Sequence, residues 1–294
     1  MKRILSGVLG LLFSLSVSAA GSGPGAVRKQ VEASTLLTGT IVVDERGNVR
    51  EHAIDQPDKI EKNVLEFVDA NVANWKFEPI ALDGKPVAVR NKMNIRLVAK
   101  KQQNGNFAIR ISGVSFDPFA RAATESAGSK GMTVTASEGG MPPPRYPEVA
   151  QRSGVQGTVY LVLQIGRDGN VLDMMPEQVN LKVVTSENAM RQWRDVFAKS
   201  AMRAAKDWKF IPPSAGEWVD EPFWSVRVPI DYTFENEGRK YGEWDAYVPG
   251  PRQQVPWRNW TDSPAFSPDT MVAGRVQQVG GKNGLRLLTP LQNG

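Results

Sequence analysis

The chain contains two stretches that repeat the same short motifs in the same order. Gly-Asn-Val occurs at residues 47–49 and again at 169–171. Each copy is followed by Trp-Lys-Phe-x-Pro, and then by a run in which apolar and polar residues alternate. Motifs that recur in one order indicate an internal repeat, in which each copy is one supersecondary unit. The sequence therefore predicts a tandem of two small α+β units.

Each copy has the residue pattern of two strands, a helix and a third strand. Gly47 and Gly169 fall between alternating runs, where glycine allows the positive φ that a hairpin turn needs. In the first copy, Asp58 and Glu61 have the spacing of a helix N-cap and its reciprocal partner. Apolar residues then recur every three or four positions up to Trp75. We therefore predict two short antiparallel β-β-α-β sheets, each with a helix packed on one face.

Large aromatic residues on the predicted helices and just after them should form the two cores. The Trp-Lys-Phe motifs could instead stack on a ligand, but aromatic side chains of this size more often lock a helix onto a sheet. The predicted core residues are Trp75, Phe77, Trp193, Phe197, Trp208 and Phe210.

Changes in composition divide the chain into five segments. We assign residues 1–20 to a signal peptide, 35–112 to the first unit and 146–234 to the second unit. Residues 113–145 have the composition of a linker, rich in glycine and serine and then in proline. Residues 235–294 contain tryptophans among prolines and glycines without a sustained period. We expect this last segment to pack irregularly against the second unit or to form a partly ordered tail.

The N-terminus has the three parts of an export signal. Lys2 and Arg3 precede the apolar run 4–17, and Ser18-Ala19-Ala20 supplies small residues for cleavage. The run is shorter than the ~20 residues that a membrane-spanning helix needs. We expect export with cleavage and no stable membrane span. An uncleaved anchor is the alternative.

The scarcity of cysteine and histidine limits the chemistry that the chain can perform. It has no cysteine, and His52 is its only histidine, so the usual nucleophile–base pairs and zinc sites cannot be assembled. We predict no metal, no cofactor and no enzymatic activity. A hydrolase that uses carboxylates alone stays an alternative, because such a site leaves little trace in sequence. A formal charge of +5 gives no reason to expect nucleic-acid binding.

The second unit resembles the C-terminal domain of the TonB family of energy-transducing envelope proteins. The resemblance covers residues 146–234, and the first unit looks like a degenerate copy without the opening Tyr-Pro helix. It does not extend to the membrane helix and long proline-rich spacer of the complete transducers. The residues that carry it are Tyr146, Pro147, Ala150, Gly154, Gly157, Val159, Asp168, Gly169, Val171, Ala201, Met202, Ala205, Trp208, Phe210 and Pro212.

The resemblance implies a periplasmic binding module whose last strand is open at the edge of its sheet. A partner strand, in the family a segment of an outer-membrane receptor, would add there by β-augmentation. Pro229 interrupts the donors of this strand, which is typical of an edge. The residues expected to bind the partner strand are Val226, Arg227, Val228, Ile230, Asp231, Tyr232, Thr233 and Phe234.

Besides the hydrolase, one other function remains open at this point. The chain could be a structural or assembly protein of the envelope, in which the same edge is buried between the two units or in a dimer. The uncleaved N-terminus would make it an inner-membrane protein that faces the periplasm. A free final strand would favour binding, and a covered one would favour assembly.

Overall fold

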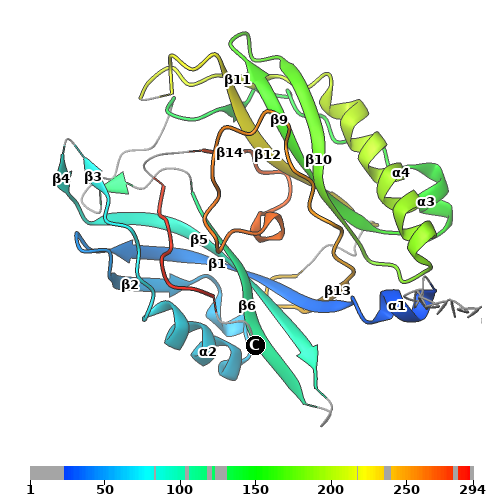
Figure 1. Ribbon diagram of the computed structural model, residues 1–294, viewed down its shortest axis with the longest axis horizontal. Coiled ribbons are helices and arrows are strands. Elements are labelled where there is room, and N and C mark those ends of the chain that lie inside the picture. Colours follow the sequence, from blue (N-terminus) through cyan, green and yellow to red (C-terminus); the bar gives the residue numbers. More distant parts are fainter. Residues whose placement is uncertain are drawn as a thin grey trace, which may run out of the picture.

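The computed structural model describes residues 23–82, 84–102, 106–117, 121–122, 131–216, 218–234, 240–280 and 284–291. The predicted signal peptide lies outside the described residues. Two larger antiparallel sheets, each with a helix packed on one face, form the main part of the described chain (Figure 1). The fold is therefore α+β, as the sequence predicts.

The first sheet is built on two long strands. Its strand order is β13-β1-β5-β6, where β13 comprises Asp245–Tyr247. Strand β2 lies beside β13 along the outer edge of β1. Helix α2 supplies Val64, Val68 and Val72 to the core on one face of this sheet. The main elements are β1 (Glu32–Val43), β2 (Val49–Ile54), α2 (Lys62–Val72), β5 (Val89–Lys101) and β6 (Phe107–Phe116). Shorter elements are α1 (Pro24–Arg28), η1 (Pro57–Lys59), β3 (Ala81–Leu82), β4 (Lys85–Pro86) and β7 (Arg121–Ala122).

The second sheet has the strand order β10-β9-β12-β14. Tyr146 and Pro147 lead into a short helix, and the long helix α4 packs on one face of the sheet. The elements are α3 (Glu148–Arg152), β9 (Gly157–Gly166), β10 (Val171–Leu181), α4 (Glu187–Ala205), β12 (Phe223–Tyr232) and β14 (Gln277–Gln278). A separate two-stranded pair joins β8 (Thr135–Ala136) to β11 (Phe210–Ile211).

The two repeated motifs contact each other in the same way in both units. Gly47 has φ +83°, and its carbonyl accepts from the N–H of Phe77 at 2.8 Å. Gly169 has φ +77°, and its carbonyl accepts from the N–H of Phe210 at 2.9 Å. In both units a Cβ on the glycine would lie 2.0 Å from the phenylalanine carbonyl oxygen, so the close approach requires glycine. That the units are copies of one repeat stays a prediction, which this correspondence supports.

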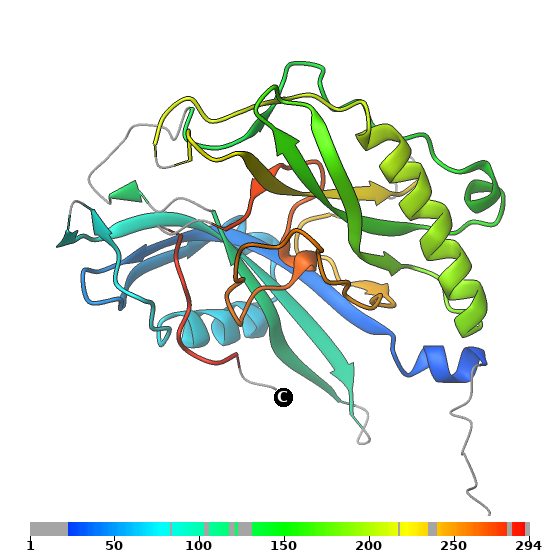
Figure 2. The same cartoon turned by 45° about the horizontal axis from the view of Figure 1, so that its top comes forward.

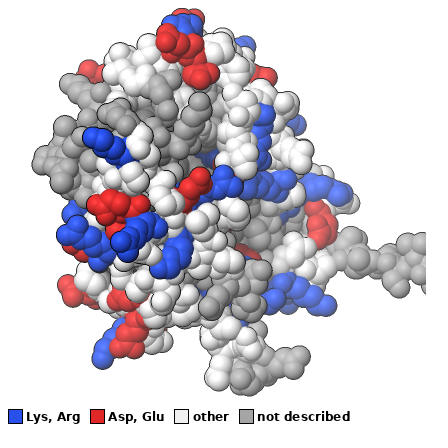
Figure 3. All heavy atoms as spheres, turned by 60° about the vertical axis from the view of Figure 1, so that its left-hand side comes forward, with Lys and Arg blue, Asp and Glu red and all other residues white. Residues whose placement is uncertain are grey.

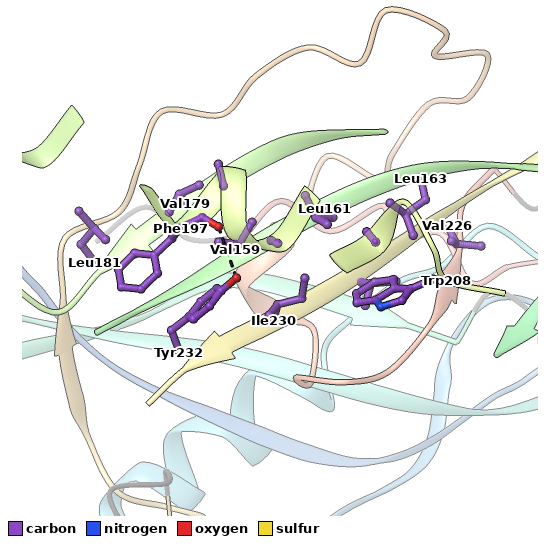
Figure 4. Close-up of a cluster of buried hydrophobic side chains, with 14 of the residues drawn as sticks. Val159, Leu161, Leu163, Val179, Leu181, Phe197, Trp208, Val226, Ile230 and Tyr232 are labelled. Carbon is purple, nitrogen blue, oxygen red and sulfur yellow. Dashed lines mark hydrogen bonds between the residues drawn. The ribbon is translucent and has the colours of Figure 1, made fainter. Parts of the chain in front are cut away.

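The predicted aromatic core residues differ in how deeply they are buried. Trp75, Phe77, Trp208 and Phe210 are buried just after the two helices, and Phe197 is buried on α4. Figure 4 shows Phe197 and Trp208 among apolar side chains of β9, β10 and β12. The indole N–H of Trp208 donates to the carbonyl of Pro142 at 2.9 Å, so the proline run packs on the second unit. Trp193 is only partly buried, because it lies at the border of the helix face that covers the sheet.

The C-terminal segment runs between the two sheets and contacts both (Figure 2). Strand β13 (Asp245–Tyr247) pairs with β1, whereas β14 pairs with β12. Near the end of the chain, Leu287 bridges to Phe77 of the first unit. The short helix η2 (Pro268–Thr270) lies against β5 and β6. The segment therefore packs against both units, not only against the second one as expected.

Candidate interaction edge

Strand β12 presents its main chain at one edge of the second sheet and buries most of its side chains. Val226, Val228, Ile230 and Tyr232 point into the core beneath α4. Arg227 points to the opposite face and is also buried. A partner at this strand must therefore be recognised mainly through main-chain hydrogen bonds.

The C-terminal segment already occupies part of this edge. Val226 is opposite Gln278, and Arg227 is opposite Gln277, in antiparallel pairing. The N–H of Val279 donates to the carbonyl of Ser225 at 3.0 Å. Between residues 225 and 229 the edge is therefore not free, contrary to the expectation from the sequence. Partner binding at β12 stays a prediction.

Pro229 marks where this coverage ends. Its carbonyl accepts from the N–H of Gly274 at 2.9 Å, so its ring nitrogen, which has no hydrogen, faces the same outer edge. Beyond it, Asp231 is exposed, and its carboxylate accepts from the hydroxyl of Thr158 at 2.6 Å. Phe234 stacks on the ring of Tyr146, with centroids 5.3 Å apart. Among the described residues, no strand pairs with the outer edge of residues 231–234.

A buried group of charged residues attaches the C-terminal segment to the face of the second sheet that points away from α4. The Arg227 guanidinium donates to Glu177 at 2.6 and 3.0 Å and to Asp262 at 2.8 Å. Arg252 donates to the same Glu177 at 2.7 Å and also to Asp262 at 2.6 Å. The ring of Phe266 lies 4.4 Å from the Arg227 guanidinium. Burial alone would raise the pKa of Asp262, but the two arginines outweigh it and hold that pKa below its usual value.

Two cavities open to solvent border β14. One, of about 380 Å³, is lined by residues that include Glu78, Arg227 and Asp262, and the other, of about 400 Å³, by Lys92 and others. Gln277 and Gln278 line both cavities. The Gln278 side chain is buried, and its oxygen accepts from the N–H of Val134, while its amide nitrogen has no hydrogen-bond partner among the described residues. The short strand is therefore bordered by open cavities and carries one buried donor without a partner among the described residues.

Known proteins resemble the part of the chain that forms the second unit. Residues 142–234 match the family model described as Gram-negative bacterial TonB protein C-terminal. These residues form a TonB C-terminal-like domain. The resemblance stated from the sequence is thereby confirmed for the second unit.

The curated relatives match only about a third of the chain. Protein TonB from two strains of Xanthomonas campestris pv. campestris, B100 and ATCC 33913, is 34% identical over 102 residues, which are 35% of this chain and 40% of the relative. Protein tonB2 of Pseudomonas aeruginosa PAO1 is 30% identical over 91 residues, 31% of this chain and 28% of the relative. The chain thus spans less than half the length of the curated relatives it matches. No solved structure matches the chain significantly.

The charged surface of the protein carries mixed signs. Figure 3 shows basic and acidic side chains next to one another over much of the face it presents. Arg90 lies 4.0 Å from Glu51, and Arg286 lies 3.9 Å from Glu78. Exposed pairs of this kind contribute little to stability. None of the described helices is both long and apolar enough to span a membrane.

The sequence pointed to the edge strand of the TonB C-terminal-like domain but not to what covers it. The sequence does not predict a role for the residues that cover this strand. Each lies in a segment without clear periodicity or among polar residues that are usually exposed: Glu177, Asp262, Gln277 and Gln278. Arg227 alone could have indicated that this face of the sheet is covered. A charged residue inside an alternating apolar strand needs a buried carboxylate partner if the opposite face of the sheet is covered.

Proposed function

We propose that this protein is a periplasmic interaction module, and not an enzyme, that binds an extended segment of a partner protein in connection with TonB-type transport. The partner is a protein or peptide of the cell envelope, such as a segment of an outer-membrane receptor. The observation that carries the proposal is the β12 edge of a TonB C-terminal-like domain, which none of that domain's own strands covers on its outer side.

The binding mode we propose is strand addition along β12. Residues 231–234 offer an edge without a paired strand among the described residues, and binding would extend toward Val226. Because most side chains of β12 point into the core, the main chain would supply most of the interaction and shallow outward positions such as Asp231 would supply selectivity.

A proline at Asp231 tests this mode. Asp231 lies two residues after Pro229, so its N–H points to the same outer edge of β12. That edge already lacks a donor at Pro229, and Asp231→Pro removes the next one. An unpaired partner carbonyl costs about 1–3 kcal/mol, which is roughly a ten- to hundredfold loss of affinity. Asp231→Ala is the matched control, since it removes the side-chain bond to Thr158 but keeps the N–H.

The measurement starts from partners captured from an outer-membrane extract by the full chain. Each captured protein is identified by mass spectrometry, and its dissociation constant is then measured for the parent and the two variants. Circular dichroism checks that both variants are folded. If the folded proline variant binds as tightly as the alanine variant, β12 is not the recognition edge.

The occupied part of the edge favours a second candidate function. In an envelope assembly protein, β14 would close the edge permanently and the C-terminal segment would serve to hold the two units together, alone or in a dimer. In that case no extended partner competes with β14.

The charged residues around the first cavity favour neither candidate, and they give no support to a hydrolase. A general acid needs a raised pKa, whereas the pKa of Asp262 is lowered by two arginines.

We propose that residues 1–20 are removed during export. Mass spectrometry of the native protein should then find a mature form that begins near Ala20 or Gly21. An intact N-terminus in the membrane fraction would instead support an inner-membrane protein that faces the periplasm.

A further inference from the structure

We propose that residues 271–280 are a displaceable strand, which occupies the edge of β12 until an extended partner strand takes its place antiparallel to β12. This inference rests on the proposed function and concerns how access to the same edge is regulated. The internal strand and the partner would compete for the same main-chain groups of residues 225–229.

The first unit shows what a permanently closed edge looks like. There β5 follows the helix and pairs with β1, as β12 follows α4 and pairs with β9. The outer edge of β5 pairs with β6 from Met93 to Lys101, and β6 is the next strand along the chain. By contrast, β12 and β14 are opposed at only two positions, Val226 and Arg227, and the hydrogen bonds of the same segment reach no further than Ser225 and Pro229. One edge is closed by a long local hairpin and the other by a short segment from far along the chain.

The occupant of the β12 edge leaves one buried donor unpaired. Two cavities open to solvent border β14, and the buried amide nitrogen of Gln278 has no partner among the described residues. A buried unpaired donor destabilises the state that contains it. A partner strand without this defect can therefore replace β14.

The segment is attached at both ends by residues outside it, and its release would withdraw Val279 from the buried cluster that contains Val162 and Trp260. On one side, the carbonyl of Asp269 accepts from the buried guanidinium of Arg96 at 2.8 Å. On the other side, the N–H of Glu78 donates to the carbonyl of Arg286 at 3.0 Å. Gly274 and Gly280, both with positive φ, lie within the segment between these two attachments. Residues 271–280 thus form a strap between two fixed ends.

An engineered disulfide can lock this strap. The chain has no cysteine, so Val226→Cys/Gln278→Cys introduces the only two thiols. The two residues are opposite each other in antiparallel strands, where Cα separations of roughly 4.5–5.5 Å suit a disulfide. Ala99→Cys/Ile109→Cys, an opposed pair on β5 and β6, is the matched control for oxidation away from β12.

A second variant opens the strap. Gln277 lies two residues before Val279, so its N–H points to the same side of the strand, toward β12. Gln277→Pro removes that donor. Gln277→Ala is its control, since it removes only the side-chain bond to the Phe116 carbonyl. The probe is a fluorescent synthetic peptide with the sequence of residues 271–280, and its binding to the full chain is measured by fluorescence anisotropy.

The apparent affinity of the peptide should follow the fraction of open chains. The oxidised 226–278 disulfide should abolish binding and reduction should restore it, whereas the oxidised control should bind like the parent. Gln277→Pro should bind the peptide about tenfold more tightly than Gln277→Ala, or better. Equal binding by the oxidised and reduced 226–278 variant, or no gain from the proline, would overturn the inference.

The captured envelope partner separates this inference from the proposed function. If the partner binds the oxidised 226–278 variant normally but is lost on Asp231→Pro, the edge is the recognition site and the strap does not regulate it. If the peptide exchanges as expected but the partner binds every variant alike, the strap is displaceable and the proposed function is wrong.

Discussion

Replacing Arg227 by methionine should destabilise the protein far more than the same change at Arg152. The two arginines have similar ion pairs: Arg227 lies 2.6 Å from Glu177, and Arg152 lies 2.8 Å from Glu148. They differ in burial, since the side chains of the first pair are 3% and 2% exposed and those of the second are both 80% exposed.

The expected magnitude follows from what each change leaves behind. Without Arg227, Glu177 stays buried with Arg252 as its remaining cation, and Asp262 loses two of its hydrogen bonds. Removing one partner of a buried ion pair costs about 3–5 kcal/mol, and the remaining arginine places this case near 3 kcal/mol. The exposed i,i+4 pair should lose only about 0.3–0.5 kcal/mol.

Urea unfolding followed by tryptophan fluorescence measures both losses. For a chain of this size, 3 kcal/mol corresponds to a fall in melting temperature of about 6–12 °C. The double variant Arg227→Met/Glu177→Met should recover part of the loss, because it no longer buries a carboxylate that has lost one of its two arginine partners. A loss below about 1 kcal/mol for Arg227→Met, or one equal to that of Arg152→Met, would refute this reasoning.

Three further predictions concern the second unit and its cover. Trp208→Ala should cost about 3–5 kcal/mol in urea unfolding, whereas Trp208→Phe should lose mainly the bond to the Pro142 carbonyl, about 0.5–1.5 kcal/mol. Gly169→Ala should cost clearly more than Gly139→Ala in the same assay. Both positions have positive φ, but a Cβ at Gly169 would lie 2.0 Å from a carbonyl oxygen, whereas one at Gly139 would meet nothing within 4 Å. The pKa of Asp262 is lower in the folded protein than the value of about 3.8 for the unfolded chain, so ionised Asp262 stabilises the fold above that pH. This stabilisation is lost as the pH falls through the pKa of the folded state. Asp262→Asn should therefore flatten the acid side of a plot of unfolding free energy against pH.

Local patterns in the sequence were enough for the repeated elements of both units. The turns at Gly47 and Gly169 and the burial of Trp75 and Trp208 depend on neighbours close in sequence or on one helix face. The start of the first helix was less accurate. Asp58 belongs to a short 3-10 turn and the helix begins at Lys62, because Pro57 starts the 3-10 turn and no side chain caps the helix.

Long-range contacts of the C-terminal segment could not be derived in this way. Gln277 and Gln278 are polar and form a strand of only two residues, so they carry no hydrophobic period. Their partners on β12 lie about fifty positions earlier in the chain, and the residue that binds Asp269, Arg96, lies in the other unit. Such contacts depend on how the two sheets are placed, which the periodicity of either segment alone does not specify.

The covered faces of the second sheet make its edge the natural place for recognition. One face lies under α4, and on the other Val162 is fully buried against Val255, Trp260 and Val279 of the C-terminal segment. The family match ends at residue 234, so these covering residues lie outside it. A sheet covered on both faces can still accept a partner strand along its edge, because main-chain donors and acceptors point in the plane of the sheet. The strap at residues 271–280 lies on that edge, and its position is the reason to expect that it competes with a partner.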